Sequence, residues 1–174
     1  MTDGIRIGRI TDLCDLDKIT GWMYGWWGRK EHYSREAVKC CMAHSFQTDR
    51  LPQTFGMYHG NNLIGIYQFV KADLFVRPDI YPWLANVYID SNCRGKGYGR
   101  LLLASVRNSA EEAGLSELFL FTEHMGLYEK FDWEYVGTID TFLEPKLQRL
   151  YRLDIRNGYT GSRRADNETG ALQE

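Results

Sequence analysis

The spacing of hydrophobic residues divides the chain into segments of extended and of helical periodicity. Alternating or short unbroken apolar runs are typical of strands, and apolar residues that recur every three or four positions are typical of helices. The predicted strands cover residues 5–10, 54–59, 63–70, 83–89, 118–121, 135–141 and 147–155. The predicted helices cover residues 11–24, 34–43 and 97–113, and residues 125–131 are long enough for about two further turns.

Local capping and turn residues mark several element boundaries. Ser34 is a preferred N-cap for the second helix, because its hydroxyl can accept a hydrogen bond from the first turn. Gly114 follows the third helix, where a left-handed residue commonly closes a helix. Gly60, Asn61 and Asn62 join two strands, and glycine and asparagine tolerate the positive φ of a tight hairpin turn.

The order of the elements predicts an α+β fold with one mixed, mostly antiparallel sheet. The order is β-α-α-β-β-β-α-β-α-β-β. The hairpin strands must be antiparallel, whereas the strand–helix–strand unit over residues 83–122 should be parallel and right-handed. We therefore expect about seven strands flanked by about four helices. One domain covers residues 1–156, and the polar residues 157–174 form a tail that we expect to be disordered.

Composition and charge narrow the function classes. The chain has 174 residues, 44% of them hydrophobic and 25% charged, which is ordinary for one globular domain. A net charge of −2 gives no global attraction to nucleic acid or to an anionic membrane. We find no long apolar run and no signal peptide, and the four cysteines form no C-x-x-C pair. We therefore expect a cytoplasmic protein with free thiols and no metal site.

A glycine-rich segment between the strand at 83–89 and the third helix carries the clearest chemical signal. It reads Arg94-Gly95-Lys96-Gly97-Tyr98-Gly99-Arg100. Glycines allow a tight backbone turn, and the unpaired N–H groups at a helix N-terminus attract phosphate. The dinucleotide pattern G-x-G-x-x-G and the P-loop pattern are both absent. The segment therefore predicts a phosphate-binding loop of another kind, with an ordinary turn before a helix as the alternative.

The loop also resembles a known family. Arg94-x-x-Gly97-x-Gly99 is similar to the R/Q-x-x-G-x-G/A loop of the GNAT superfamily of acetyl-CoA-dependent N-acetyltransferases, and the element order is similar from residue 5 to 155. The resemblance implies acetyl-CoA as the cofactor, with the acyl-pantetheine inserted where the central strands splay. It implies that the cofactor contacts are Val87, Tyr88, Ile89, Arg94, Gly95, Lys96, Gly97, Tyr98, Gly99 and Arg100.

A second segment resembles the same family. Residues 127–133 are similar to the family's L-Y-x-K-x-G-F/W pattern, with Asp132 where glycine usually stands. The resemblance implies that Tyr128 is the general acid that protonates the leaving thiolate. Ordinary phenol and thiol pKa values differ by about 1.5 units, so a short hydrogen bond can transfer the proton. The alternative is that Tyr128 only packs in the core beside Phe131.

The acceptor side is less defined. Some family members carry a glutamate as base on the strand before the loop, and the matching residue here is Trp83. The residues left as candidates for the base are Glu123, His124, Glu31 and Asp73. Aromatic residues gather at 22–27 and 75–83, where tryptophans can line a flat pocket or hold a cationic amine. The candidate substrate-binding residues are Trp26, Trp27, Trp83, Glu31 and Asp73.

Three functions are compatible with these residues. The first is transfer of an acetyl group from acetyl-CoA to a primary amine of a small molecule, by direct attack in a ternary complex. The second is acetylation of a protein or peptide, which needs an open groove. The third is a non-catalytic acyl-CoA-binding module, which Trp83 at the base position favours. Exposed edge strands and surplus aromatic residues also make a homodimer an open alternative.

Overall fold

The computed structural model describes residues 4–142 and 146–156. Seven strands form one sheet in the order β1-β2-β3-β4-β5-β7-β6, and only the β4–β5 pair is parallel. The sheet is therefore mixed and mostly antiparallel, as the element order predicted. The strands are β1 (Ile5–Arg9), β2 (Gln53–His59), β3 (Asn62–Val70), β4 (Trp83–Ile89), β5 (Glu117–Thr122), β6 (Glu134–Asp140) and β7 (Leu147–Asp154).

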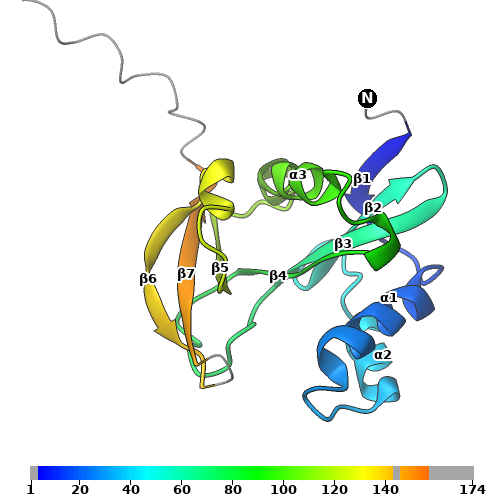
Figure 1. Cartoon of the computed structure of the whole chain (residues 1–174), viewed down its shortest axis with the longest axis horizontal. Coiled ribbons are helices and arrows are strands. Elements are labelled where there is room, and N and C mark those ends of the chain that lie inside the picture. The colour runs from blue at the N-terminus through cyan, green and yellow to red at the C-terminus, as the bar shows by residue number, and fades with distance from the viewer. Residues whose placement is uncertain (1–3, 143–145, 157–174) are drawn as a thin grey trace, which may run out of the picture.

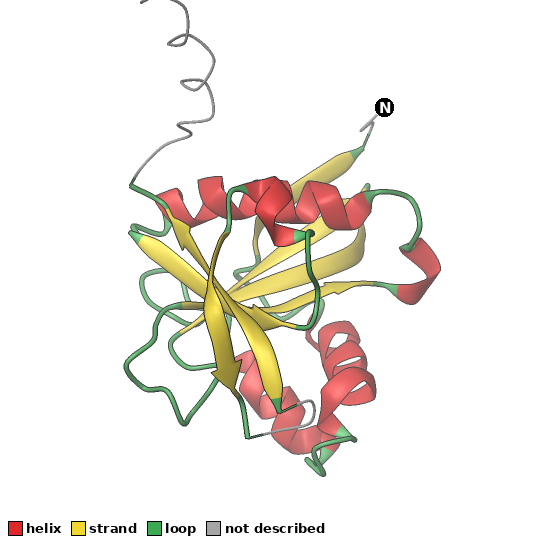
Figure 2. Ribbon diagram, turned by 60° about the vertical axis from the view of Figure 1, so that its left-hand side comes forward, coloured by secondary structure: helices red, strands yellow, loops and turns green. Residues whose placement is uncertain are grey.

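Three α-helices cover the sheet, α1 (Leu16–Met23), α2 (Arg35–Ala43) and α3 (Tyr98–Glu112). Figures 1 and 2 show α3 lying across one face, while α1 and α2 pack together on the other. The predicted fourth helix is only a 3₁₀ turn, Tyr128–Phe131. The first helix also differs, because the chain continues beyond the predicted helix end at residue 24 as a π-helical turn, Tyr24–Gly28.

The predicted capping residues behave as expected. The Ser34 hydroxyl accepts a hydrogen bond from the Ala37 amide at 3.1 Å, which begins α2. Gly114 adopts a φ of +71°, and the Leu115 amide donates to the Ala110 carbonyl at 2.9 Å after α3. These contacts satisfy backbone groups that each helix end would otherwise leave unpaired. Both helix boundaries therefore follow from local sequence.

Side chains on the two faces of the sheet form separate cores. Beneath α3, residues such as Phe55, Tyr67 and Leu102 are almost completely buried. On the opposite face, Ile19 and Met42 from α1 and α2 pack against β3. In β5, Leu118 and Leu120 face the core beneath α3, whereas Phe119 and Phe121 pack on the other face against a third cluster that includes Trp83 and Leu150, which explains why the run at 118–121 is apolar throughout.

The strands separate in the middle of the sheet. In the described residues, β4 and β5 share a single registered pair, Trp83 with Phe119. Beyond that pair no strand lies against the β5-facing edge of β4. Figure 1 shows the resulting halves, with β1–β3 on one side and β5–β7 on the other. The tail at 157–174 lies outside the described residues.

Candidate functional site

The loop between β4 and α3 ends in a set of open backbone amides. Gly95 and Gly97 have φ values of +76° and +81°, a region that favours glycine, and no atom lies within 4 Å of where their Cβ would stand. The Arg100 and Leu101 amides donate to the Gly97 carbonyl, which makes these the first bonds of α3. The Tyr98 and Gly99 amides precede these bonds, and no side chain caps the helix.

This geometry fits a diphosphate. Open N–H groups at the start of a 15-residue helix carry the positive end of the helix dipole. In the described part of the chain, neither Lys96 nor Arg100 forms an ion pair, so both charges remain available beside the loop. The Arg94 Nε donates to the Ile89 carbonyl at 3.0 Å, and its guanidinium lies over the Tyr88 ring at 5.1 Å. Arg94 therefore stabilises the turn that follows β4.

The last residues of β4 alternate between the two faces of the sheet. Val87 and Ile89 pack into the core beneath α3, whereas Tyr88 packs on the opposite face against α1. Their backbone follows the edge that has separated from β5. The thioester arm of a coenzyme A held by the loop would lie along this edge.

Tyr128 lies in the same core as Val87 and Ile89. It is 8% exposed and touches the rings of Tyr151 and Trp133. Among the described residues its hydroxyl has no hydrogen-bond partner, yet it is not one of the fully buried unpartnered atoms. Tyr128 is thus a packed ring whose hydroxyl keeps some exposed surface, which leaves both alternatives predicted from sequence open.

Burial raises the pKa of Tyr128 to about 12, with a smaller contribution from Tyr151. The phenol is therefore fully protonated at neutral pH and can donate a hydrogen bond. The gap to an ordinary thiol widens to about 3.5 pKa units, or about 5 kcal/mol, against the 1.5 units expected from unperturbed groups. Proton transfer from this phenol to a thiolate would therefore be less favourable than between unperturbed groups, although the phenol can still donate a hydrogen bond to the sulfur.

The aromatic residues divide into two groups. The rings of Trp22 and Trp26 lie 5.3 Å and 5.6 Å from that of Tyr88, and Trp26 is 49% exposed. Lys18 already covers the Trp22 ring at 5.3 Å, as Arg94 covers Tyr88. The cluster on this face is therefore aromatic with its own cations, and Trp26 offers the accessible surface.

Trp27 and Trp83 are placed differently. The Trp27 Nε1 donates to the Asn86 Oδ1 at 3.0 Å, so its polar atom is already engaged. Trp83 is completely buried between Phe119 and Phe121, and its indole N–H has no partner in the described residues. It lies at the base of the gap between β4 and β5, where a side chain could close the bottom of a ligand site.

Two carboxylates stand near each other on the acceptor face. Asp73, in the loop between β3 and β4, has exposed surface, although neighbouring protein atoms displace part of the water around its carboxylate. This loss of water, followed by the charge of Glu31, raises the pKa of Asp73 to about 6. In the described residues, neither carboxylate has a cationic partner. The other proposed bases, Glu123 and His124, are exposed just beyond β5.

Sequence reasoning missed Asn86 and Gln68. Asn86 has a φ of +52° in the middle of β4, and its Nδ2 donates to the Gln68 Oε1 at 2.6 Å. The register of β3 against β4 shifts by one residue here. An asparagine inside an apolar strand was the available signal, since asparagine is depleted in strands and tolerates left-handed φ.

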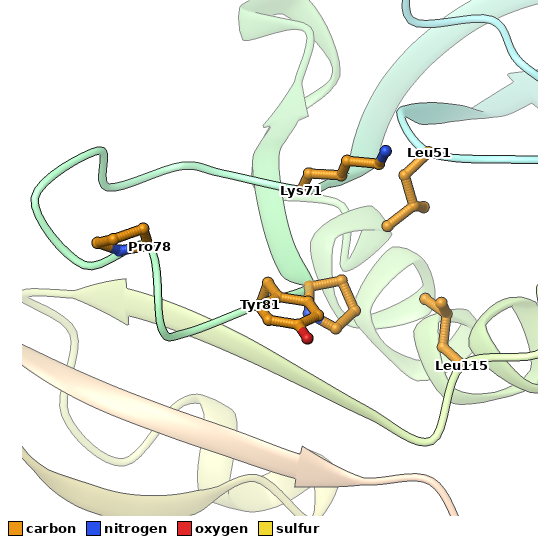
Figure 3. A pocket seen from close by; sticks show the side chains of 6 residues that line it. Leu51, Lys71, Pro78, Tyr81 and Leu115 are labelled. Atoms are coloured by element: carbon orange, nitrogen blue, oxygen red, sulfur yellow. The ribbon is translucent and has the colours of Figure 1, made fainter.

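A separate apolar hollow of about 510 Å³ lies away from this site (Figure 3). Leu115, one of its lining residues, lies beyond the C-terminal end of α3, and the 15 residues of that helix span about 22 Å from the glycine loop. Tyr81 and Lys71 face it across the hollow. Having no open amides or paired carboxylates, the hollow lacks the chemistry of the loop site.

The described residues contain neither a candidate metal site nor a membrane-spanning helix. Within residues 4–142 and 146–156, no group of three His, Cys, Asp or Glu side chains could hold a metal ion. No helix in that part of the chain is long and apolar enough to cross a membrane. The four cysteines are free thiols, three of them exposed.

A family model described as Acetyltransferase (GNAT) family matches residues 16–133. That span contains the glycine loop, the β4 edge and Tyr128. No curated protein sequence matches the chain.

Solved structures match over nearly their whole length. An aminoglycoside 6′-N-acetyltransferase complexed with coenzyme A has a TM-score of 0.66 at 13% identity, covering 86% of this chain and 97% of its own. A GNAT family acetyltransferase from Elizabethkingia anophelis with acetyl-CoA bound has a TM-score of 0.58 at 14% identity, covering 87% and 99%. An acetyltransferase from Salmonella typhimurium that modifies the N-terminal serine of ribosomal protein L7/L12 has a TM-score of 0.64 at 9% identity, covering 88% and 96%.

Proposed function

The chain belongs to the GNAT family of acetyltransferases and uses acetyl-CoA as its acetyl donor, and from that premise we propose that its acceptor is the primary amine of a small molecule. The observation that carries the proposal is the carboxylate pair of Asp73 and Glu31, which lacks a cationic partner in the described residues. An amine is an ammonium ion at neutral pH and would supply that charge. Trp26 would cover the apolar part of the molecule.

Each residue of the proposed site would have a separate role in the reaction. Bound acetyl-CoA supplies an activated acetyl thioester. The amides of Tyr98 and Gly99 hold its diphosphate, and β4 aligns its arm. Asp73 would orient the ammonium ion, which releases one proton to solvent before its nitrogen attacks the acetyl carbon, and the nitrogen releases a second proton to solvent as the amide forms. Tyr128 donates its hydroxyl proton to the sulfur as the C–S bond breaks and regains one from solvent. The net products are the amide, coenzyme A and one proton.

Acetylation of a protein or peptide is the competing function. The Salmonella typhimurium structure modifies a protein N-terminus, and the aminoglycoside enzyme acts on a small molecule. The Trp-rich turn that narrows the acceptor face supports the small molecule here. A chain entering that face would have to displace Trp26, which lies against Tyr88.

The test is titration calorimetry with acetyl-CoA, followed by a thiol-release assay against panels of small amines and of peptides. We expect acetyl-CoA to bind and small amines, especially those with two or more amino groups, to release coenzyme A. Release with peptides alone would overturn the proposed acceptor. Absence of binding at millimolar acetyl-CoA would overturn the proposal as a whole.

A further inference from the structure

The middle of β4 contains a bulge that decides which side chains face which core. Gln68 of β3 pairs with Ala85 and Ile66 pairs with Tyr88, so Tyr67 stands opposite two residues, Asn86 and Val87. An extra residue in a strand reverses the facing of every side chain after it. Without it, Tyr88 would point into the core beneath α3.

The bulge therefore determines the orientation of side chains on both the acetyl-CoA edge and the acceptor face of the proposed site. It turns Tyr88 toward the aromatic cluster of α1, and it turns Val87 and Ile89 beneath α3. It also lies on the stretch of β4 that has parted from β5. A shift in the bulge would move the acetyl-CoA edge and the acceptor face together.

The bulge is costly to hold. A φ of +52° places Asn86 in the left-handed region, which asparagine tolerates better than most residues with a side chain but which still costs energy relative to extended backbone. Such a conformation persists only where surrounding contacts enforce it. Here the contacts are side-chain hydrogen bonds from two directions.

These hydrogen bonds form a continuous chain across five segments. The Trp27 indole donates to Asn86 at 3.0 Å, and Asn86 donates to Gln68 at 2.6 Å. The Gln68 Nε2 donates to the Thr54 hydroxyl at 2.8 Å, which donates to the Ser45 carbonyl at 2.9 Å. Gln68 and Thr54 are almost completely buried. The chain thus connects the π-helical turn to β4, β3, β2 and the residues that follow α2.

The direction of every bond in this chain is determined by its two ends. An indole N–H can only donate and a backbone carbonyl can only accept. Between them, the amides of Asn86 and Gln68 have a single orientation that satisfies all partners, because reversing either would place two donors or two acceptors together. Loss of the Trp27 donor would release this constraint at the bulge.

We propose that Trp27, Asn86 and Gln68 are positioning residues that hold the β4 bulge, and with it the acetyl-CoA edge, in register with the acceptor-binding turn. The inference rests on the proposed function for its consequence in catalysis. It assigns Trp27 a role in the hydrogen-bond chain, beside the exposed Trp26 that faces the acceptor.

The test compares Trp27→Phe, which keeps an aromatic ring but loses the N–H, with Asn86→Gly, which keeps the freedom for positive φ but loses the side chain. Amide hydrogen exchange of the free protein reports on residues 83–89. We expect exchange there to accelerate about tenfold in each variant and no further in the double variant, because both break one chain. Trp133→Phe is the control, since its indole N–H has no partner in the described residues.

A second readout separates positioning from general stability. With the best amine of the panel, each variant should lose about tenfold in kcat and the double variant also about tenfold, while acetyl-CoA affinity stays within about threefold. Unchanged exchange in β4, additive losses of activity, or a fall in affinity that parallels kcat would each overturn the inference. If Asn86→Gly does not fold, Asn86→Asp replaces it, because it keeps the acceptor for Trp27 and loses the donor to Gln68.

If wild-type protein binds no acetyl-CoA, the proposed function fails by itself. The exchange experiment on the free protein still decides whether the hydrogen-bond chain holds the bulge.

Discussion

The donor and acceptor parts of the proposed site are built in different ways. The donor side is one continuous segment, in which the backbone of residues 94–100 presents amides and positive charges. The acceptor side combines side chains from distant segments, among them Trp26, Asp73 and Asn86. A site made of backbone recognises a constant chemical group, and a site made of dispersed side chains can be changed one residue at a time. The donor is therefore fixed by the fold, and the acceptor by this particular sequence.

Tyr128→Phe tests the residue proposed to act at the junction of the two sides, and we expect the largest effect from it. Removing a hydroxyl that protonates the leaving sulfur should lower kcat roughly a hundredfold, which is the lower range of general acid catalysis. Acetyl-CoA affinity should not change, because the ring remains packed. Stopped-flow thiol release and calorimetry measure the two quantities.

Tyr135→Phe is the matched control for this prediction. Tyr135 is 42% exposed on β6, and its hydroxyl lies 3.1 Å from that of Thr138. Its kcat should equal that of the wild type. Equal losses of kcat and affinity in Tyr128→Phe would assign Tyr128 a structural role only.

Gly97→Val tests the backbone side. At a φ of +81°, a β-branched residue should cost about 1–3 kcal/mol. If that cost distorts the amides at the start of α3, acetyl-CoA affinity falls roughly thirtyfold while the acceptor side is untouched. Calorimetry measures the affinity.

Gly60→Val is the control, because Gly60 also has positive φ, +58°, with open space around it, but lies in the turn between β2 and β3. It should lose stability and keep acetyl-CoA affinity. A similar affinity loss in both variants would show that the effect of Gly97→Val is not local.

Asp73→Asn tests the acceptor side and should have the smallest effect. Losing an exposed carboxylate should raise KM for the amine about fivefold and leave acetyl-CoA affinity unchanged. Because the pKa of Asp73 is raised to about 6, wild-type kcat/KM should fall as pH drops through that value, and the variant should lack this step. Asp79→Asn, which removes the partner of Arg77 in the same loop, should behave like wild type.

The raised pKa of Asp73 also makes the stability of the folded protein depend on pH, and this contribution decreases as pH rises. Its pKa is higher in the folded protein than its ordinary value of 3.8, so its favourable contribution is complete below pH 3.8 and is lost as pH rises through about 6. At pH 8, Asp73→Asn should therefore have a higher Tm than wild type, with the difference disappearing near pH 4. A lower Tm at pH 8 would contradict the assigned cause of the pKa shift.

The conformation of the glycine loop could be predicted from sequence because its determinants are local. A glycine at each left-handed position and a helix starting directly afterwards are visible in seven consecutive residues. Strand order was equally accessible, since the periodicity of β4 and the apolar run in β5 are strong signals. Asp132 illustrates the same point, because its φ of +62° is the conformation that the family's usual glycine would take.

The acceptor side could not be predicted in the same way. The pairing of Trp27 with Asn86 joins residues 59 positions apart, and the raised pKa of Asp73 depends on desolvation by the folded chain and on the charge of the distant Glu31. The local pattern also predicted about two helical turns over residues 125–131, but only one 3₁₀ turn forms there. The π-helical turn at Tyr24–Gly28 was missed because a glycine pair suggests a helix end when tertiary contacts are unknown.

The most direct test of the account is an amide NMR titration of ¹⁵N-labelled protein with coenzyme A, using pantetheine, which lacks the diphosphate, as the matched ligand. We predict that coenzyme A shifts the amide signals of Gly97, Tyr98 and Gly99, and that pantetheine leaves them in place while shifting those of β4. Signals that stay fixed at the glycine loop, with shifts at Tyr81 and Leu115 around the apolar hollow instead, would contradict the account.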